Sequence, residues 1–412
     1  MKPSKWKFAA ALYLVGVLLI HALVFWNARE LVWKGYPDFT IYYCAGTIVR
    51  QGLGPHLYEE ATQFKVQKGF APDVAIRLGA LPYNHPPFEG LYFLPFTYLP
   101  YRTAFIFWGL ANLAMLMALP LLLRPHLPEL RIYCWPLWVL ASLAFFPIFF
   151  ALLQGQDTIL LLFLYTLAFA LLKKNHDTVA GVSLTLGLFK FHLVLPFVLL
   201  LLVQGRKRIL YGFLSTATVL AVASVAVVGW HGITSYPHYV LQVEETMARG
   251  AIVPSDMPNL RGVLYLLLHG GPHVGVVALV LSVAILLFTA WRCFGVADPE
   301  FFDSKFSLGV LATVLVSYHA SGYDLSILML PVLLLANELL GKGRAGGWPA
   351  RLMFIAAAVF FVSPLQLFLL MKAKRLALVG WAVLLWWCGI VGHISTRIRH
   401  HPSARIPATL PS

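Results

Sequence analysis

The chain contains a succession of long apolar runs, and this feature limits its possible folds more than any other. The first run extends from about Phe8 to Trp26, and similar runs recur up to residue 396. A helix needs about 20 apolar residues to cross the hydrocarbon core of a bilayer. Because 59% of the residues are hydrophobic and only 12% are charged, the sequence predicts an all-α integral membrane protein.

We expect a single polytopic membrane domain over residues 1–412, with about 10 to 12 transmembrane helices. The first run follows a basic leader, MKPSKWK, and no small-residue cleavage pattern comes after it. It is therefore predicted to remain as an uncleaved anchor. The expected spans lie near residues 8–27, 102–123, 132–153, 158–172, 178–189, 192–203, 208–229, 274–293, 306–319, 323–340, 350–370 and 376–396.

The basic residues predict how the chain crosses the membrane. Its net charge is +14, but Lys and Arg stand in short clusters between apolar runs, which is typical of topology signals and lipid headgroup contacts and not of a nucleic acid site. If residues 178–189 and 192–203 form a broken pair, the cluster at 206–208 faces the cytoplasm. We expect a multi-pass plasma membrane protein in contact with membrane lipids, both termini cytoplasmic, with a polar cytoplasmic tail at 397–412.

Two sizeable segments are expected on the extracytoplasmic side, at residues 28–100 and 230–260. Apolar residues recur at helical spacing over 39–50 and predict an amphipathic helix lying along the membrane surface. A second short helix is predicted over 59–68. The stretch from Tyr83 to Pro100 is apolar but interrupted by prolines, so a re-entrant or interfacial hairpin is expected there.

Neither a metal site nor a disulfide framework is indicated. The four cysteines show no CxxC spacing, and the chain has no Asp-x-Asp pair. Glu59 and Glu60 are adjacent on a predicted helix, where neighbouring side chains diverge. We expect no metal and no cofactor.

Asp38 stands just beyond the first span, so its carboxylate is expected beside the bilayer and not within it. A carboxylate in that position can accept a proton from a hydroxyl while a lipid-borne reaction partner is held in the outer leaflet.

Seven motifs follow one another along the chain. They are DFTIYYCAG (38–46), GLGPHLYEE (52–60), YNHPPFEGLYFLPFTYLP (83–100), LLQGQDTILLLF (152–163), AGVSLTLGLFKFHLVLPFVLLLL (180–202), NLRGVLYLL (259–267) and YHASGYDLSILMLPVLLL (318–335). In order and spacing this set resembles glycosyltransferase family 87, also catalogued as domain-of-unknown-function family 2029, whose members are polyprenol-phosphate-mannose-dependent enzymes of the GT-C class. The resemblance covers roughly residues 8–340.

The resemblance implies transfer of a sugar, mannose or another hexose, from a polyprenyl-phosphate donor to a hydroxyl of a glycolipid or glycan. Transfer would proceed with inversion on the extracytoplasmic side, without a metal, and with the lipid-linked sugar as substrate. Asp38 would be the general base. The residues implied to bind the donor phosphate are Lys190, Arg261 and His319, and those implied to line the sugar site are Tyr42, Tyr43, Tyr83 and His85.

Structural interpretations of the same residues stay open. Asp38 follows a proline and also fits a helix N-cap, and Lys190 fits a snorkelling lysine at a helix end. Arg261 fits an interfacial anchor, and His319 a hydrogen-bonded histidine at a helix end. Asp157 and Asp324 each precede an apolar helix and are predicted to be caps. A lipid or solute transporter or flippase, or a membrane scaffold, would have a similar number of spans.

Overall fold

The fold is all-α, as the sequence predicts. The computed structural model describes residues 5–73, 79–245, 253–294, 299–341 and 347–400, and within them it has eighteen α-helices and no β-strand. The first nine helices are α1 (Lys5–Trp33), α2 (Phe39–Arg50), α3 (Glu60–Phe70), α4 (Glu89–Phe93), α5 (Tyr101–Leu123), α6 (Trp135–Ala144), α7 (Phe146–Gln154), α8 (Thr158–Lys173) and α9 (Asp177–Leu186). The other nine are α10 (Phe191–Val203), α11 (Ile209–Glu245), α12 (Leu260–Leu267), α13 (Val274–Phe294), α14 (Phe302–Val316), α15 (Met329–Leu340), α16 (Trp348–Ala358), α17 (Ser363–Leu367) and α18 (Gly380–His400).

Among the described residues, five helices are long and apolar enough to cross a membrane, and the number is eight if three bent helix pairs each count as one span. The five are α1, α5, α11, α13 and α18. The prediction of about 10 to 12 spans treated every apolar run as a crossing. Several of those runs instead form helices too short to span alone, such as α8, α14 and α15.

Three helix pairs within the bundle are bent by more than 40°. The break predicted at Lys190 is confirmed, since Asp177–Leu186 and Leu188–Val203 meet at 66°. The spans expected near 132–153 and 350–370 are bent helix pairs, with bends of 73° and 64°, and each pair can count as one span. Pro147 and Pro364 lie in the first turn after each bend, and a proline ring inside a continuous helix would clash with the carbonyl four residues earlier.

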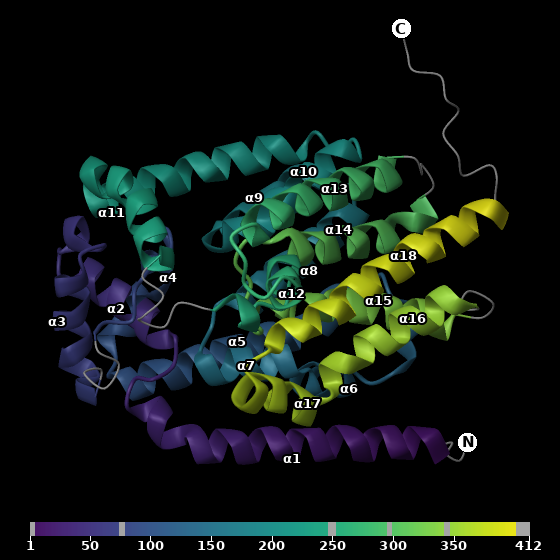
Figure 1. Ribbon diagram of the computed structural model, residues 1–412, viewed down its shortest axis with the longest axis horizontal. Coiled ribbons are helices and arrows are strands. Elements are labelled where there is room, and N and C mark those ends of the chain that lie inside the picture. The colour runs from purple at the N-terminus through teal and green to yellow at the C-terminus, as the bar shows by residue number, and fades with distance from the viewer. Residues whose placement is uncertain (1–4, 74–78, 246–252, 295–298, 342–346, 401–412) are drawn as a thin grey trace, which may run out of the picture.

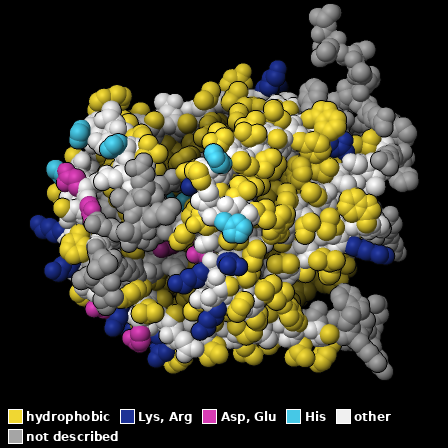
Figure 2. Space-filling model, viewed as in Figure 1, with side chains coloured by type: hydrophobic (Ala, Val, Ile, Leu, Met, Phe, Trp, Pro, Cys, Tyr) yellow, Lys and Arg dark blue, Asp and Glu magenta, His cyan; other side chains and the backbone are white. Residues whose placement is uncertain are grey.

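The helices form an elongated bundle whose two ends differ (Figure 1). The start of α1 and the end of α18 lie at one end, while α2, α3 and α4 lie at the other. Apolar side chains cover most of the face shown in Figure 2, and charged side chains gather around the end that carries α2 and α3. Leu19, Leu121 and Val280 are each more than 60% exposed, as expected where lipid and not water surrounds a helix.

The helix predicted over 39–50 is present as α2, but its predicted position on the membrane surface is wrong. All side chains from Phe39 to Ile48 are buried, because α3, α4 and the turn at Leu94–Tyr98 pack around the helix. Before Arg50, α2 carries only apolar, hydroxyl and thiol side chains. A helix with no strongly polar face is stable when it is covered on all sides.

The structure describes only part of the other segments that were expected outside the membrane. The predicted helix at 59–68 appears as α3, and residues 83–100 contain α4 followed by a short 3-10 helix at Leu94–Tyr98. The predicted extracytoplasmic segment 230–260 begins as helix, because α11 bends at Gly229, where φ is +70°, and continues to Glu245. Residues 246–252 lie outside the described part, as does the predicted tail from residue 401.

Close packing of α9 on α11 gives a prediction about stability. A Cβ atom at Gly212 would lie 1.9 Å from the Thr178 carbonyl oxygen, so Gly212→Ala forces the two backbones apart. We expect a loss of about 1–3 kcal/mol and a lower midpoint of thermal unfolding in detergent. Gly109→Ala on α5 is the matched control, because nothing lies within 4 Å of a Cβ there. Equal midpoints for the two variants would contradict this packing.

Candidate active site

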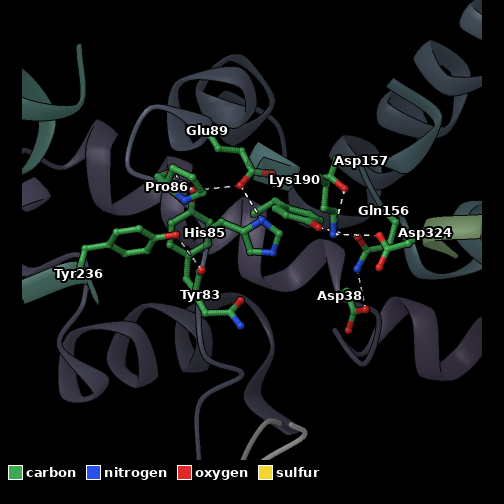
Figure 3. Close-up of polar contacts among 12 residues, drawn as sticks. Asp38, Tyr83, His85, Pro86, Glu89, Gln156, Asp157, Lys190, Tyr236 and Asp324 are labelled. Atoms are coloured by element: carbon green, nitrogen blue, oxygen red, sulfur yellow. Dashed lines mark hydrogen bonds and ion pairs between the residues drawn. The ribbon is translucent and has the colours of Figure 1, made fainter. Parts of the chain in front are cut away.

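Several segments that are distant in sequence surround one pocket of about 510 Å³, and one of them is the start of α2. Its lining includes a carboxylate from the residue before α2, a histidine from the loop before α4, and side chains from the α7–α8 turn, the α9–α10 break and the α14–α15 connection. The polar lining residues used below are Asp38, His85, Gln156, Lys190, His319 and Asp324. Figure 3 shows how most of these side chains converge.

Asp38 faces the pocket and is held there by two glutamines. Gln156 Nε2 donates a hydrogen bond to Asp38 Oδ2 over 2.7 Å, and the Asp38 backbone N–H donates to Gln154 Oε1 over 3.2 Å. The Asp38 side chain makes no capping hydrogen bond to α2. The N-cap interpretation of Asp38 is therefore wrong. Its carboxylate lines the pocket instead.

Lys190 lies between two buried carboxylates at the break between α9 and α10. Its Nζ is 3.5 Å from Asp157 Oδ1 and 3.4 Å from Asp324 Oδ1, and only 5% of the lysine is exposed. The snorkelling interpretation is therefore wrong.

The prediction that Asp157 and Asp324 cap helices is also wrong, because neither side chain makes a capping bond. Both acids compensate a buried lysine charge, and Asp324 Oδ2 also accepts from the Ser321 N–H.

Behind this part of the wall lies a group that could hold a metal ion. Ligand atoms of His85, Glu89 and Asp157 lie within 4.8 Å of one another, and His85 Nδ1 is 2.8 Å from Glu89 Oε2. Burial lowers the pKa of His85 to about 4 and raises the pKa of Glu89 to about 7. The Lys190 ammonium already places a positive charge 3.5 Å from Asp157, so a cation here would meet a like charge.

Two of the three residues predicted to bind the donor phosphate line the pocket, Lys190 and His319. Arg261 lies on α12 beside it. Its guanidinium stacks on the Tyr318 ring, 3.9 Å from the centroid, and donates to the Tyr318 carbonyl over 3.2 Å. Tyr318 itself lines the pocket, whereas Arg261 is not among the lining residues and lies behind the Tyr318 ring.

Of the four residues predicted to line the sugar site, only His85 is among the lining residues. The three tyrosines are buried in the packing around α2, and their hydroxyls are engaged within the protein. Tyr42 donates to Gln156 Oε1, Tyr43 to the Leu99 carbonyl and Tyr83 to the Pro86 carbonyl. The structure thus differs from the expectation for these three residues, which support the wall and do not face the cavity.

Gln156 and His192 are lining residues that were not predicted as site residues from the sequence. Gln156 belongs to the LLQGQD motif, but nothing in that motif says which side chain its amide meets. His192 follows Lys190 by two positions and lines the pocket, and its Nε2 has no hydrogen-bond partner among the described residues. A histidine at the start of an apolar helix was the available signal for His192.

Comparisons with known proteins identify the family. The family model of glycosyltransferase family 87 matches residues 83–317, which is more than half of the chain and includes the loop with His85, the Gln156 turn and the Lys190 break. Searches of curated proteins and of solved structures found no match. Together with the apolar helices described above, this match shows that the chain belongs to glycosyltransferase family 87 and is a membrane glycosyltransferase.

Proposed function

We propose that the protein is a GT-C enzyme that transfers mannose or another hexose from a polyprenyl-phosphate donor to a hydroxyl of a glycolipid or glycan acceptor, with inversion. The observation that carries this proposal is the pocket that pairs a positioned carboxylate, Asp38, with a buried ammonium, Lys190. Val240, Leu241 and Leu376 line the same pocket, and such apolar side chains suit the isoprenoid part of a lipid-linked donor.

In this proposal Asp38 is the general base. The acceptor oxygen attacks the anomeric carbon, and its proton passes to the Asp38 carboxylate. The bond between the anomeric carbon and the phosphate oxygen breaks, and its electron pair leaves with the polyprenyl phosphate. A single displacement of this kind inverts the configuration at the anomeric carbon.

The departing phosphate gains negative charge, so catalysis requires positive charge or hydrogen-bond donors on the side of the pocket where it leaves. We assign Lys190 and His319 to that side, with Arg261 adding its charge from behind Tyr318. Asp157 and Asp324 keep the lysine charged and in place. His85, neutral at pH 7 because burial lowers its pKa to about 4, is assigned to hydrogen bonds with the sugar.

We further propose that the pocket opens on the extracytoplasmic side of the plasma membrane and that both termini are cytoplasmic. The arrangement in Figure 1 supports this, because the start of α1 and the end of α18 share one end of the bundle and α2 lies at the other. The basic clusters at 173–174 and 206–208 agree with that orientation, whereas the cluster of Lys372, Lys374 and Arg375 does not.

The proposal is tested by incubating purified protein in detergent with radiolabelled polyprenyl-phosphate-mannose and extracted membrane lipids and glycans. Labelled acceptor is expected, with the anomeric configuration opposite to that of the donor. Retained configuration would exclude the single displacement. No product, combined with donor movement between leaflets of reconstituted vesicles, would favour a flippase.

We expect transfer without a divalent cation, because the phosphate leaves as a stable anion and protein cations face it. Treatment of the purified enzyme with excess EDTA should leave the initial rate within about twofold of the untreated rate. A loss of activity that Mg²⁺ or Mn²⁺ restores would contradict this expectation. It would direct attention to His85, Glu89 and Asp157, whose ligand atoms are already close together.

A further inference from the structure

The turn between α7 and α8 places two glutamines on either side of Gly155. Gly155 has φ of +61°, and a Cβ there would lie 2.7 Å from Phe39 Cβ and 2.9 Å from Phe105 Cε2. Trp108 Nε1 donates to the Gly155 carbonyl over 2.9 Å. A glycine is required for both the backbone conformation and the close approach. The turn is therefore fixed against the start of α2, next to Asp38.

The orientation of the Gln156 amide is determined by its neighbours. Tyr42 donates its hydroxyl hydrogen to Gln156 Oε1 over 2.6 Å, and Gln156 Nε2 donates to Asp38 Oδ2 over 2.7 Å. If the amide were turned over, its carbonyl oxygen would face a carboxylate oxygen, and neither can donate a hydrogen bond. Figure 3 shows the amide reaching Asp38 from the side of Asp324 and Lys190.

These contacts form a closed arrangement within the wall of the pocket. Tyr42 stands four residues after Asp38, one turn along α2. The Gln156 amide therefore hydrogen-bonds to two side chains that lie one helical turn apart at the start of this helix. Gln156 is 1% exposed and Tyr42 is fully buried. The bond to Asp38 is half-buried, since the carboxylate also lines the pocket, and a hydrogen bond to an ionised carboxylate is strong and directional. Rotation of the Asp38 carboxylate is consequently restricted.

We propose that Gln156, oriented by Tyr42, is a positioning residue that fixes the Asp38 carboxylate in its ionised, base-competent orientation. This inference rests on the proposed function, in which Asp38 takes the acceptor proton. Gln156 itself needs no contact with substrate. Its amide N–H favours the charged form of the carboxylate and sets the direction in which that carboxylate meets the acceptor hydroxyl.

The test is the pH dependence of kcat for Gln156→Glu and Tyr42→Phe. Two carboxyl groups at the Gln156–Asp38 contact would share a proton, so in Gln156→Glu the acid limb of the profile should move to higher pH by about one unit or more. Tyr42→Phe frees the amide to turn, and kcat should fall by up to about 10²-fold with KM for the donor unchanged. Gln51→Glu, at the exposed far end of α2, should keep the wild-type profile.

A second measurement separates a lost contact from a misfolded variant. In a double-mutant cycle on thermal unfolding, Gln156→Glu should lower the midpoint at pH 8, and adding Asp38→Asn should recover most of that loss because the like charges are gone. If wild type transfers sugar and Gln156→Glu keeps both its pH profile and its midpoint, the positioning role is overturned while the function stands. If wild type transfers no sugar from the lipid donor, the proposed function fails, and the role given to Gln156 fails with it.

Discussion

Asp38→Asn is expected to lower the rate of sugar transfer by about 10²–10⁴-fold, the usual contribution of a positioned general base. Asparagine keeps the size of the side chain and can still contact the Gln156 amide, which is 2.7 Å away in the wild type, so the fold should persist. What is lost is the capacity to take the acceptor proton as the new glycosidic bond forms. The measurement is the initial rate with radiolabelled polyprenyl-phosphate-mannose at saturating acceptor.

Asp73→Asn provides the matched control for this variant. Asp73 lies in the same segment between α1 and α5, its side chain is 38% exposed, and it forms an ion pair with Lys34 over 3.7 Å. Exposed pairs of this kind contribute at most about 1 kcal/mol, so its rate should equal that of wild type. Donor binding by Asp38→Asn should also be retained. Equal product from Asp38→Asn and wild type would remove Asp38 from the mechanism.

The spacing of apolar and basic residues correctly predicted one helix and one helix break. The helix expected at 39–50 corresponds to α2 (Phe39–Arg50), because its apolar residues recur at helical spacing. The break at Lys190 was predicted from the position of the basic cluster after it. The bends at Phe145 and Val362 were not predicted, because a proline shortly after each bend is also compatible with an ordinary helix start.

What the sequence could not predict is which distant segments meet. Asp157 and Asp324 each precede an apolar helix, where capping is the common role of an aspartate, and nothing local indicates that both approach Lys190. The family resemblance implied that Tyr42 lines the sugar site. Its hydroxyl instead meets Gln156, a contact that depends on how the α7–α8 turn packs on α2.

Burial was also set by tertiary packing. The pattern of α2 fits a surface helix as well as an enclosed one, since Arg50 at its end is its only charged residue. The covering helices α3 and α4 decide between the two. The consequence for function is that Asp38 begins a buried helix and not a mobile surface segment, so its carboxylate can be held by neighbours on both sides.

Lys190→Met is expected to destabilise the protein strongly as well as stop transfer. The change leaves the Asp157 and Asp324 carboxylates without the ammonium that lies 3.5 and 3.4 Å from them. Removing one partner of a buried charge pair costs about 3–5 kcal/mol. The midpoint of thermal unfolding in detergent should therefore fall well below that of Lys65→Met, which replaces an exposed lysine on α3.

Separating this structural role from a role toward the donor phosphate requires a second substitution. Lys190→Met with Asp324→Asn removes one positive and one negative charge, so the net charge of the buried group equals that of the wild type, and much of the lost stability should return. If the ammonium stabilises the departing phosphate, transfer stays absent in this restabilised variant, because a neutral methionine offers no charge or donor there. Recovery of transfer together with stability would show that Lys190 only neutralises the two acids, and the phosphate role would pass to His319 and Arg261.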